Sequence, residues 1–278
     1  MSGLEWLGRG KFGNVWGKCD VALKVVKIPM DRPSWHDELI REAIVCGQIK
    51  FFQSQEVSGS DKVIRFLGAS LEIKDSQYIF RLEMSRAHGG SLLDAISNPG
   101  FKLSPGIIET YVSDLKAGLT FCHAICGILV RDISPGNVLI PNADDMHFVL
   151  ADFGKARPMT DNLVNVEYSE GYHGAPVYQP PRAFMSYKCR LDNDMNYNWR
   201  FADWYSLGAV AIWVCNPQRF WSMGPEHTDD MNVEEAYIDF TRKQVPILLA
   251  AACEVMHKAD ARTISRWIQR ELAIVASV

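Results

Sequence analysis

The sequence predicts an α+β protein of two lobes, in which a small β-rich lobe with one helix precedes a larger, mainly helical lobe. Three observations support this prediction. Up to residue 84, short runs rich in β-branched and aromatic residues alternate with glycines and polar segments, as in residues 21–26. In that part, residues 34–52 carry apolar side chains at helical spacing. After Gly89 and Gly90, helical patterns dominate.

The change in pattern divides the chain into an N-terminal lobe at residues 1–84, a connection at residues 85–90 and a C-terminal lobe at residues 91–278. In the N-terminal lobe, strands are expected within residues 6–27, 63–72 and 78–84. The polar segment at residues 53–62 is expected to be a loop between the helix and the second of these regions.

The C-terminal lobe is expected to be built mainly from helices. They are predicted at residues 91–96, from Ser104 onwards, and at residues 203–215, 234–255 and 263–275. Ser104 followed by proline is typical of a helix start, because serine caps the first turn and proline fits the first helical position. Two short strands are expected at residues 137–140 and 147–150.

Composition excludes several classes of protein. The 278 residues include 29 Lys and Arg against 33 Asp and Glu, so the net charge of -4 gives no general attraction to nucleic acid or anionic lipid. The 47% of hydrophobic residues excludes a disordered chain. Seven cysteines without a framework spacing, and an N-terminus unlike a signal peptide, predict a cytoplasmic protein with reduced thiols. We expect neither a nucleic-acid nor a membrane partner.

A glycine-rich motif opens the chain. Gly8, Gly10 and Gly13 form the pattern G-x-G-x-x-G, which also occurs in dinucleotide-binding folds. Those folds need a helix after the motif, whereas here a β-rich run follows and carries Lys24 in the sequence Val-Ala-Leu-Lys. A glycine-rich hairpin followed by a lysine on a strand is suited to holding nucleotide phosphates.

The helix predicted at residues 34–52 contains two candidate partners for this lysine. Glu42 could pair with the Lys24 ammonium, and Glu38 lies one helical turn earlier as a competitor. A solvated helix carboxylate is the alternative interpretation for either residue.

A second group of motifs lies in the C-terminal lobe. Asp132 begins the pattern D-x-x-x-x-N, which ends at Asn137, and Asp152 begins the sequence Asp-Phe-Gly 15 residues later. Phosphoryl transfer needs a carboxylate that accepts the hydroxyl proton, together with an asparagine and a second aspartate that hold Mg²⁺. The three residues supply these groups in that order.

With these motifs in this order, the chain resembles the eukaryotic-type protein kinase family over nearly its whole length. Residues 174–182 are similar to the family's G-T-P-x-Y-x-A-P-E segment, residues 203–208 to its D-x-W-S-x-G helix start, and residues 260–263 to its late R-P-T element. The short loop Asp-Ile-Ser-Pro-Gly-Asn also resembles that of small, stand-alone fungal kinases. The resemblance implies the bilobal kinase fold and one kinase domain over residues 1–278.

The resemblance also implies a role for each motif residue. Lys24 and Glu42 would form an ion pair, Asp132 would be the catalytic base, and Asn137 and Asp152 would bind Mg²⁺. The expected ATP-binding residues further include, besides the three glycines, Val15, Ala22 and Leu139 around the adenine, Glu83 to Ser85 in the hinge after Leu82, and Ser91 near the ribose.

Four residues depart from the family pattern. Val130 replaces the histidine before Arg-Asp, and Ala175 and Arg182 replace a threonine and a glutamate of the later segment. Ser134 stands in the catalytic loop where Ser/Thr kinases carry a lysine. Loss of that cation removes transition-state stabilisation of about 2–4 kcal/mol, the scale of other lost electrostatic stabilisers.

The predicted function is transfer of the ATP γ-phosphate to a protein hydroxyl, on Ser or Thr rather than Tyr, with Mg²⁺ as the metal. Two alternatives remain open. A pseudokinase would bind ATP or a partner and signal without catalysis, which the four departures favour. A small-molecule phosphotransferase would share the catalytic loop pattern, but the glycine-rich loop and the later segment speak against it.

Overall fold

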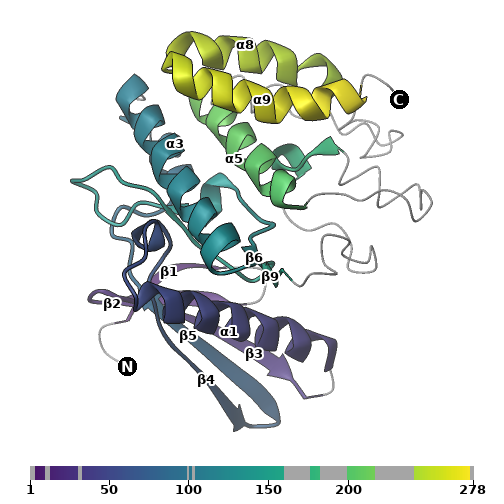
Figure 1. The fold of residues 1–278 in the computed structure, drawn as a ribbon. Helices are drawn as coiled ribbons and strands as arrows, with labels where there is room; N and C mark the ends of the chain where they lie inside the picture. Colours follow the sequence, from purple (N-terminus) through teal and green to yellow (C-terminus); the bar gives the residue numbers. More distant parts are fainter. Residues whose placement is uncertain are drawn as a thin grey trace, which may run out of the picture.

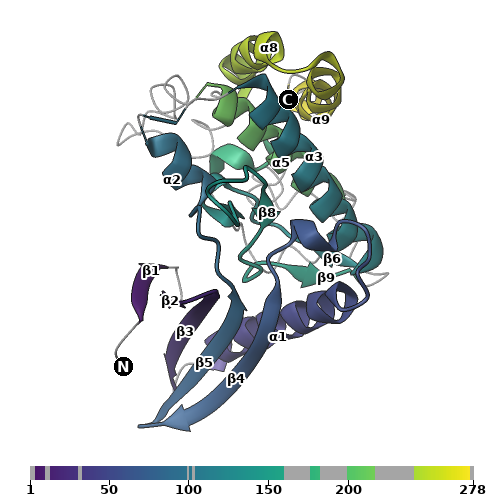
Figure 2. The same cartoon turned by 90° about the vertical axis from the view of Figure 1, so that its left-hand side faces the viewer.

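The computed structural model describes residues 4–9, 13–30, 33–98, 100–101, 104–159, 176–181, 199–216 and 241–275 (Figure 1). Three residues singled out above, Gly10, Ala175 and Arg182, lie outside the described residues. Two lobes are visible in both ribbon views, a β-rich one that contains the N-terminus and a helical one that contains the C-terminus (Figures 1 and 2).

The N-terminal lobe is built on an antiparallel sheet of five strands. These are β1 (Glu5–Arg9), β2 (Asn14–Lys18), β3 (Val21–Pro29), β4 (Phe66–Lys74) and β5 (Gln77–Ser85), in the spatial order β1-β2-β3-β5-β4. The turn between β2 and β3 has only two residues, and its Cys19 adopts a positive φ of 49°. The strands predicted within residues 6–27, 63–72 and 78–84 are thus present, with shifts of a few residues at their ends.

One long helix accompanies this sheet. Helix α1 (Pro33–Gln53) lies along the sheet beside β4 in both views (Figures 1 and 2). Its buried side chains, which include Leu39, Val45, Cys46 and Ile49, join the hydrophobic core. The helix predicted at residues 34–52 therefore forms, and its buried apolar side chains pack into the lobe interior.

The C-terminal lobe is mainly helical. Its described helices are α2 (Leu92–Ser97), α3 (Pro105–Thr120), α5 (Trp199–Cys215), α8 (Val245–Val255) and α9 (Lys258–Val275). The Ser104 hydroxyl accepts a hydrogen bond from the Ile107 amide, which is the N-cap predicted for α3. Helix α5 is the core of the lobe, with Tyr205 and Trp213 at most 1% exposed. No helix among the described residues is both long and apolar enough to cross a bilayer.

Two short strand pairs carry the loops between α3 and α5. Strands β7 (Val138–Leu139) and β8 (Val149–Leu150) lie within the two runs predicted from the sequence, and they pair with each other. Strand β6 (Ile128–Leu129) pairs with β9 (Arg157–Pro158), a pairing that two-residue strands give no sequence pattern to predict. Because each pair is antiparallel, the segment after β6 lies beside the segment before β9, and the segment before β7 lies beside the segment after β8.

The two lobes also meet where the segment after α1 approaches α3. A Cβ atom added at Gly118 in α3 would lie 2.6 Å from the backbone oxygen of Lys62, so only glycine allows this contact. Gly47 in α1 is the opposite case, because a Cβ atom there would have no heavy atom within 4 Å.

These two helical glycines form a matched pair for a stability test. We expect Gly118→Ala to lower the free energy of unfolding by about 1–3 kcal/mol through overpacking. We expect Gly47→Ala to raise it by up to about 1 kcal/mol, because alanine is the better helix former. Urea unfolding of the two variants measures both changes, and a Gly118→Ala protein as stable as Gly47→Ala would contradict the close approach.

Candidate active site

Lys24 lies at the centre of the candidate site. It is buried on the inward face of β3 with Ala22 and Val26, because strand side chains alternate in direction. Its Nζ donates to Oε1 of Glu42 at 2.7 Å and to Oδ1 of Asp152 at 3.1 Å. One ammonium therefore joins strand β3, helix α1 and the Asp-Phe-Gly loop.

The competitor Glu38 has a different partner. Its Oε2 lies 3.5 Å from Nζ of Lys155, the residue that follows Asp-Phe-Gly. Because Glu38 is one turn before Glu42, the same face of α1 holds both ion pairs. The residue pattern alone left the choice between the two glutamates open, the family resemblance implied Glu42, and the structure pairs Lys24 with Glu42.

The charges of Lys24 and Asp152 stabilise each other, whereas burial raises the pKa of Glu42 above its ordinary value in spite of the Lys24 ammonium. Burial by itself would lower the pKa of Lys24, but the carboxylates of Asp152 and Glu42 outweigh burial and raise it above its ordinary value. Desolvation would raise the pKa of Asp152, whereas the Lys24 ammonium and the Gly154 amide together bring it below its ordinary value. At neutral pH, Lys24 is thus a cation and Asp152 an anion.

The catalytic-loop segment is held by a buried carboxylate from α5. Asp203 is 1% exposed and accepts hydrogen bonds from the backbone amides of Val130 at 2.8 Å and Arg131 at 2.7 Å. Nε2 of His123 lies 2.8 Å from the same carboxylate. Arg131 has a φ of 68°, a conformation that costs about 1–3 kcal/mol and persists only where its surroundings impose it. These bonds to Asp203 impose the backbone that carries Asp132.

Asp132 itself has the electrostatics of a general base. Burial, with the nearby charge of Asp152, raises the pKa of Asp132 from 3.8 to about 6, against a hydrogen bond from Asn137 that lowers it. A carboxylate with a raised pKa is a stronger proton acceptor and is still ionised at pH 7. The Asn137 amide also donates from Nδ2 to the Asp132 backbone oxygen at 2.9 Å.

Asn137 and Asp152 have the chemistry and placement for a divalent cation. They flank the paired strands β7 and β8 at the same end, where the Ala151 amide donates to the Asn137 backbone oxygen at 2.9 Å. Because Nδ2 of Asn137 is engaged, its side-chain oxygen is the remaining ligand atom, and the Asp152 carboxylate is 43% exposed. Carboxylate and amide oxygens are ligands that suit Mg²⁺, so the two residues fit the metal that the family resemblance implies.

A cavity of about 340 Å³ lies between these groups and the sheet. Of the residues predicted to bind ATP or metal, it is lined by Gly8, Val15, Ala22, Lys24, Ser85, Ser91, Asn137, Leu139 and Asp152. Glu42 and the predicted gatekeeper Leu82 line it as well. The structure thus brings residues from both lobes to one cavity, as a nucleotide site between lobes requires.

Other predicted residues lie elsewhere or have another role. Glu83 is exposed and is not among the residues that line the cavity, where Met84 and Ala87 lie instead. Gly13 is also absent from the lining, and a Cβ atom there would lie 2.3 Å from the Val25 oxygen, so glycine is required by close packing. The Ser91 hydroxyl caps α2 by accepting from the Asp94 amide.

The four departures are only partly described. Val130 is buried, and Ser134 stands at the start of a 3-10 turn over residues 135–137 that places Asn137. Ala175 and Arg182 lie outside the described residues, and so does Gly10. The sequence analysis did not identify two residues that take part in the site. Lys155, which pairs with Glu38, has no signal in the sequence except its position after Asp-Phe-Gly. The support that Asp203 gives to the backbone before Asp132 could be suspected only from its place in the helix-start motif.

The comparisons with known proteins agree with this geometry. The chain matches the protein kinase domain family over residues 2–267. It therefore belongs to the protein kinase family, and its two lobes are those of the kinase fold.

Similar curated proteins are kinases as well. The chain is 29% identical over 121 residues to 3-phosphoinositide-dependent protein kinase 1 of Arabidopsis thaliana, which covers 41% of the chain and 24% of that protein. It is 26% identical over 168 residues to Serine/threonine-protein kinase CHK1 of Saccharomyces cerevisiae, a match that covers 60% of the chain and 29% of that protein. It is 32% identical over 108 residues to Cyclin-dependent kinase 20 of Rattus norvegicus, a match that covers 35% of the chain and 30% of that protein. The matched part is thus less than a third of each relative.

The raised pKa of Asp132 predicts a pH-dependent cost to stability. As pH rises from about 4 to 6, the unfolded chain ionises this carboxyl before the folded protein does, so stability falls across that window. Above about pH 7 the cost is constant, about 2 kcal/mol after allowance for partial exposure. We therefore expect Asp132→Asn to raise the melting temperature at pH 8 by about 4–8 °C.

Thermal unfolding at several pH values checks this expectation. The gain should shrink as the pH falls through this window and vanish below about pH 3, where the carboxyl is protonated in both states. Asp144→Asn, at an exposed carboxylate, is the matched control and should change little at any pH. A lower melting temperature of Asp132→Asn at pH 8 would show that the charge of Asp132 is not a cost in the folded protein.

Proposed function

We propose that this chain is a protein kinase that transfers the γ-phosphoryl group of ATP to a Ser or Thr hydroxyl of a protein substrate, in the cytoplasm and with Mg²⁺. The observation that carries the proposal is the Lys24 ammonium between Glu42 and Asp152, in a cavity shared with Asn137. The similarity to Ser/Thr kinases supports it.

The residues divide the chemistry among them. In the transfer, the substrate oxygen bonds to the γ-phosphorus, the bond from that phosphorus to the bridging β,γ-oxygen breaks, and ADP leaves. Asp132, with its pKa near 6, accepts the proton of the attacking hydroxyl. Lys24 holds the α- and β-phosphates, and Glu42 fixes the direction of its side chain.

Asn137 and Asp152 would hold Mg²⁺, which supplies positive charge to the phosphate oxygens when it is bound. The Gly154 amide, which donates to Oδ1 of Asp152 at 3.3 Å, helps to orient that carboxylate. Ser134 offers no cation, so Lys24 and the metal would supply positive charge in place of the lysine of the family pattern.

The direct test is incubation of the purified protein with Mg·ATP, followed by its intact mass. We expect phosphate-sized increments in the unmutated protein and in Asp144→Asn, and none in Asp132→Asn. Supplying a mixture of Ser-, Thr- and Tyr-containing peptides with labelled ATP extends the test to transfer in trans. Labelling of Tyr peptides alone would contradict the proposed specificity, and equal labelling by Asp132→Asn would contradict the role of the base.

A pseudokinase is the second candidate, and Ser134 is the observation that favours it. Without the lysine of the family pattern, the site lacks one charge that offsets the transferring phosphoryl group. Binding of Mg·ATP without any transfer to the protein or to the peptides would establish this alternative. Consumption of ATP only with added metabolites would instead identify a small-molecule phosphotransferase.

A further inference from the structure

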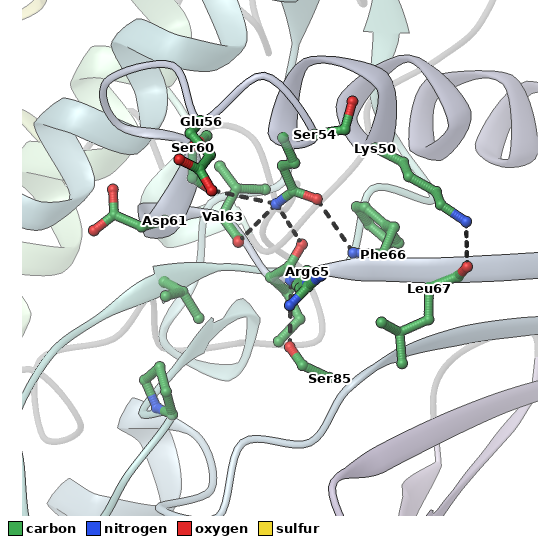
Figure 3. Close-up of a pocket in the computed structure, with 14 residues that line it drawn as sticks. Lys50, Ser54, Glu56, Ser60, Asp61, Val63, Arg65, Phe66, Leu67 and Ser85 are labelled. Carbon is green, nitrogen blue, oxygen red and sulfur yellow. Dashed lines mark hydrogen bonds between the residues drawn. The ribbon is translucent and has the colours of Figure 1, made fainter.

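Gln53, the last residue of α1, makes a concentrated set of hydrogen bonds outside the nucleotide cavity. Its Nε2 lies within hydrogen-bonding distance of the backbone oxygens of Ser60 at 3.2 Å, Val63 at 3.0 Å and Ile64 at 3.1 Å, which share its two hydrogens. Its Oε1 accepts from the Phe66 amide at 3.3 Å. Figure 3 shows these bonds converging between the labelled Ser60, Val63 and Phe66.

This set of partners fixes the side chain in one orientation. Acceptors surround the amide nitrogen and a donor faces the amide oxygen, so a flipped amide would lose all four bonds. Val63, Ile64 and Phe66 are at most 4% exposed, and polar backbone groups in such surroundings are costly to leave unpaired. Gln53 therefore serves as the polar partner for the segment that enters β4.

The segment that enters β4 contacts the Asp-Phe-Gly loop and the strand before it at two points. The Ile64 amide donates to the Leu150 oxygen at 2.8 Å, and Leu150 ends the strand that precedes Asp152. The Phe66 ring packs edge-on against Phe153, with 5.7 Å between ring centroids. The four bonds of Gln53 thus hold the two residues on which Asp152 and Phe153 rest.

The junction is packed into the hydrophobic core on one side and borders a cavity on the other. This cavity of about 790 Å³ is lined by Gln53, Val63, Phe66, Ser85 and Val149 among others (Figure 3). Side chains beside a cavity lack the dispersion contacts that neighbours would supply. Val63, Ile64 and Phe66 are buried in the core, so the hydrogen bonds of Gln53 act together with packing to place the segment.

We propose that Gln53 is a positioning residue of the active site, which sets the placement of Asp152 and Phe153 through Val63, Ile64 and Phe66. Its effect on transfer rests on the proposed function, but its effect on the loop does not. Loss of the amide should therefore loosen residues that Gln53 does not touch and weaken the binding of Mg-nucleotide.

The test compares Gln53→Met with Gln55→Met, which makes the same chemical change at an exposed position two residues on. Hydrogen exchange of residues 148–154 and titration with Mg·ADP are measured, and neither needs phosphoryl transfer. In Gln53→Met we expect about tenfold faster exchange of the Phe66 amide and of residues 150–154, the scale of one lost hydrogen bond. The Kd for Mg·ADP should rise about threefold to tenfold.

Gln55→Met should match the unmutated protein in both measurements. Faster exchange of Gln53→Met confined to residues 60–66, with unchanged exchange at residues 150–154 and unchanged affinity, would overturn the proposal and leave Gln53 a local structural role. If the unmutated protein binds Mg·ADP but transfers no phosphate, the proposed kinase activity is contradicted. The exchange and affinity of Gln53→Met would still decide the role of Gln53.

Gln53→Glu keeps the comparison decisive if Gln53→Met does not fold. The glutamate retains an acceptor for the Phe66 amide but gives up the donor to the three carbonyls. Its second carboxylate oxygen would face the three carbonyl oxygens. We therefore expect slow exchange at Phe66, faster exchange at Ile64 and weaker binding of Mg·ADP than in the unmutated protein. Exchange and affinity equal to those of the unmutated protein would overturn the proposal.

Discussion

The contact of one buried ammonium with two carboxylates is the interaction on which the active site depends. Lys24 reaches Glu42 at 2.7 Å and Asp152 at 3.1 Å, and these residues come from a strand, a helix and a loop of different lobes. A buried charge without partners would cost several kcal/mol. The chain satisfies Lys24 only when α1 lies against the sheet and the Asp-Phe-Gly loop closes on it, so electrostatics ties the arrangement of the lobes to the geometry of the site.

A second buried carboxylate supports the other half of the site. Asp203 accepts the amides of Val130 and Arg131, which keeps Arg131 at a positive φ and directs Asp132. Because Asp203 binds the backbone amides, the hydrogen bonds do not depend on the side chain at position 130. A valine there is therefore compatible with an ordered loop. The departure at Ser134 is different in kind, because it changes the charge available to the transferred group and not the shape of the loop.

The fold and most of the site could be predicted from the sequence because their signals are local or strongly patterned. The order of the motifs along the chain identified most of the site: the spaced glycines, the Val-Ala-Leu-Lys strand and the two aspartate motifs. The periodicity of apolar residues located α1, α3 and α5. Contacts between distant residues gave no such signal. The choice of Glu42 over Glu38, the pairing of β6 with β9, and the exposure of Glu83 depend on tertiary packing. Gln53 resembles any polar helix end until its four partners are in place.

The Mg²⁺ dependence of nucleotide affinity tests the central claim most directly, because it needs no substrate and no turnover. Titration with ADP, with Mg²⁺ or with EDTA, is compared for the unmutated protein and for Asp152→Asn. If Asp152 holds the metal beside Lys24, Mg²⁺ should tighten binding about tenfold in the unmutated protein and should have little effect in the variant. Equal Mg²⁺ dependence in both proteins, or no binding of ADP to the unmutated protein, would contradict the account of the site.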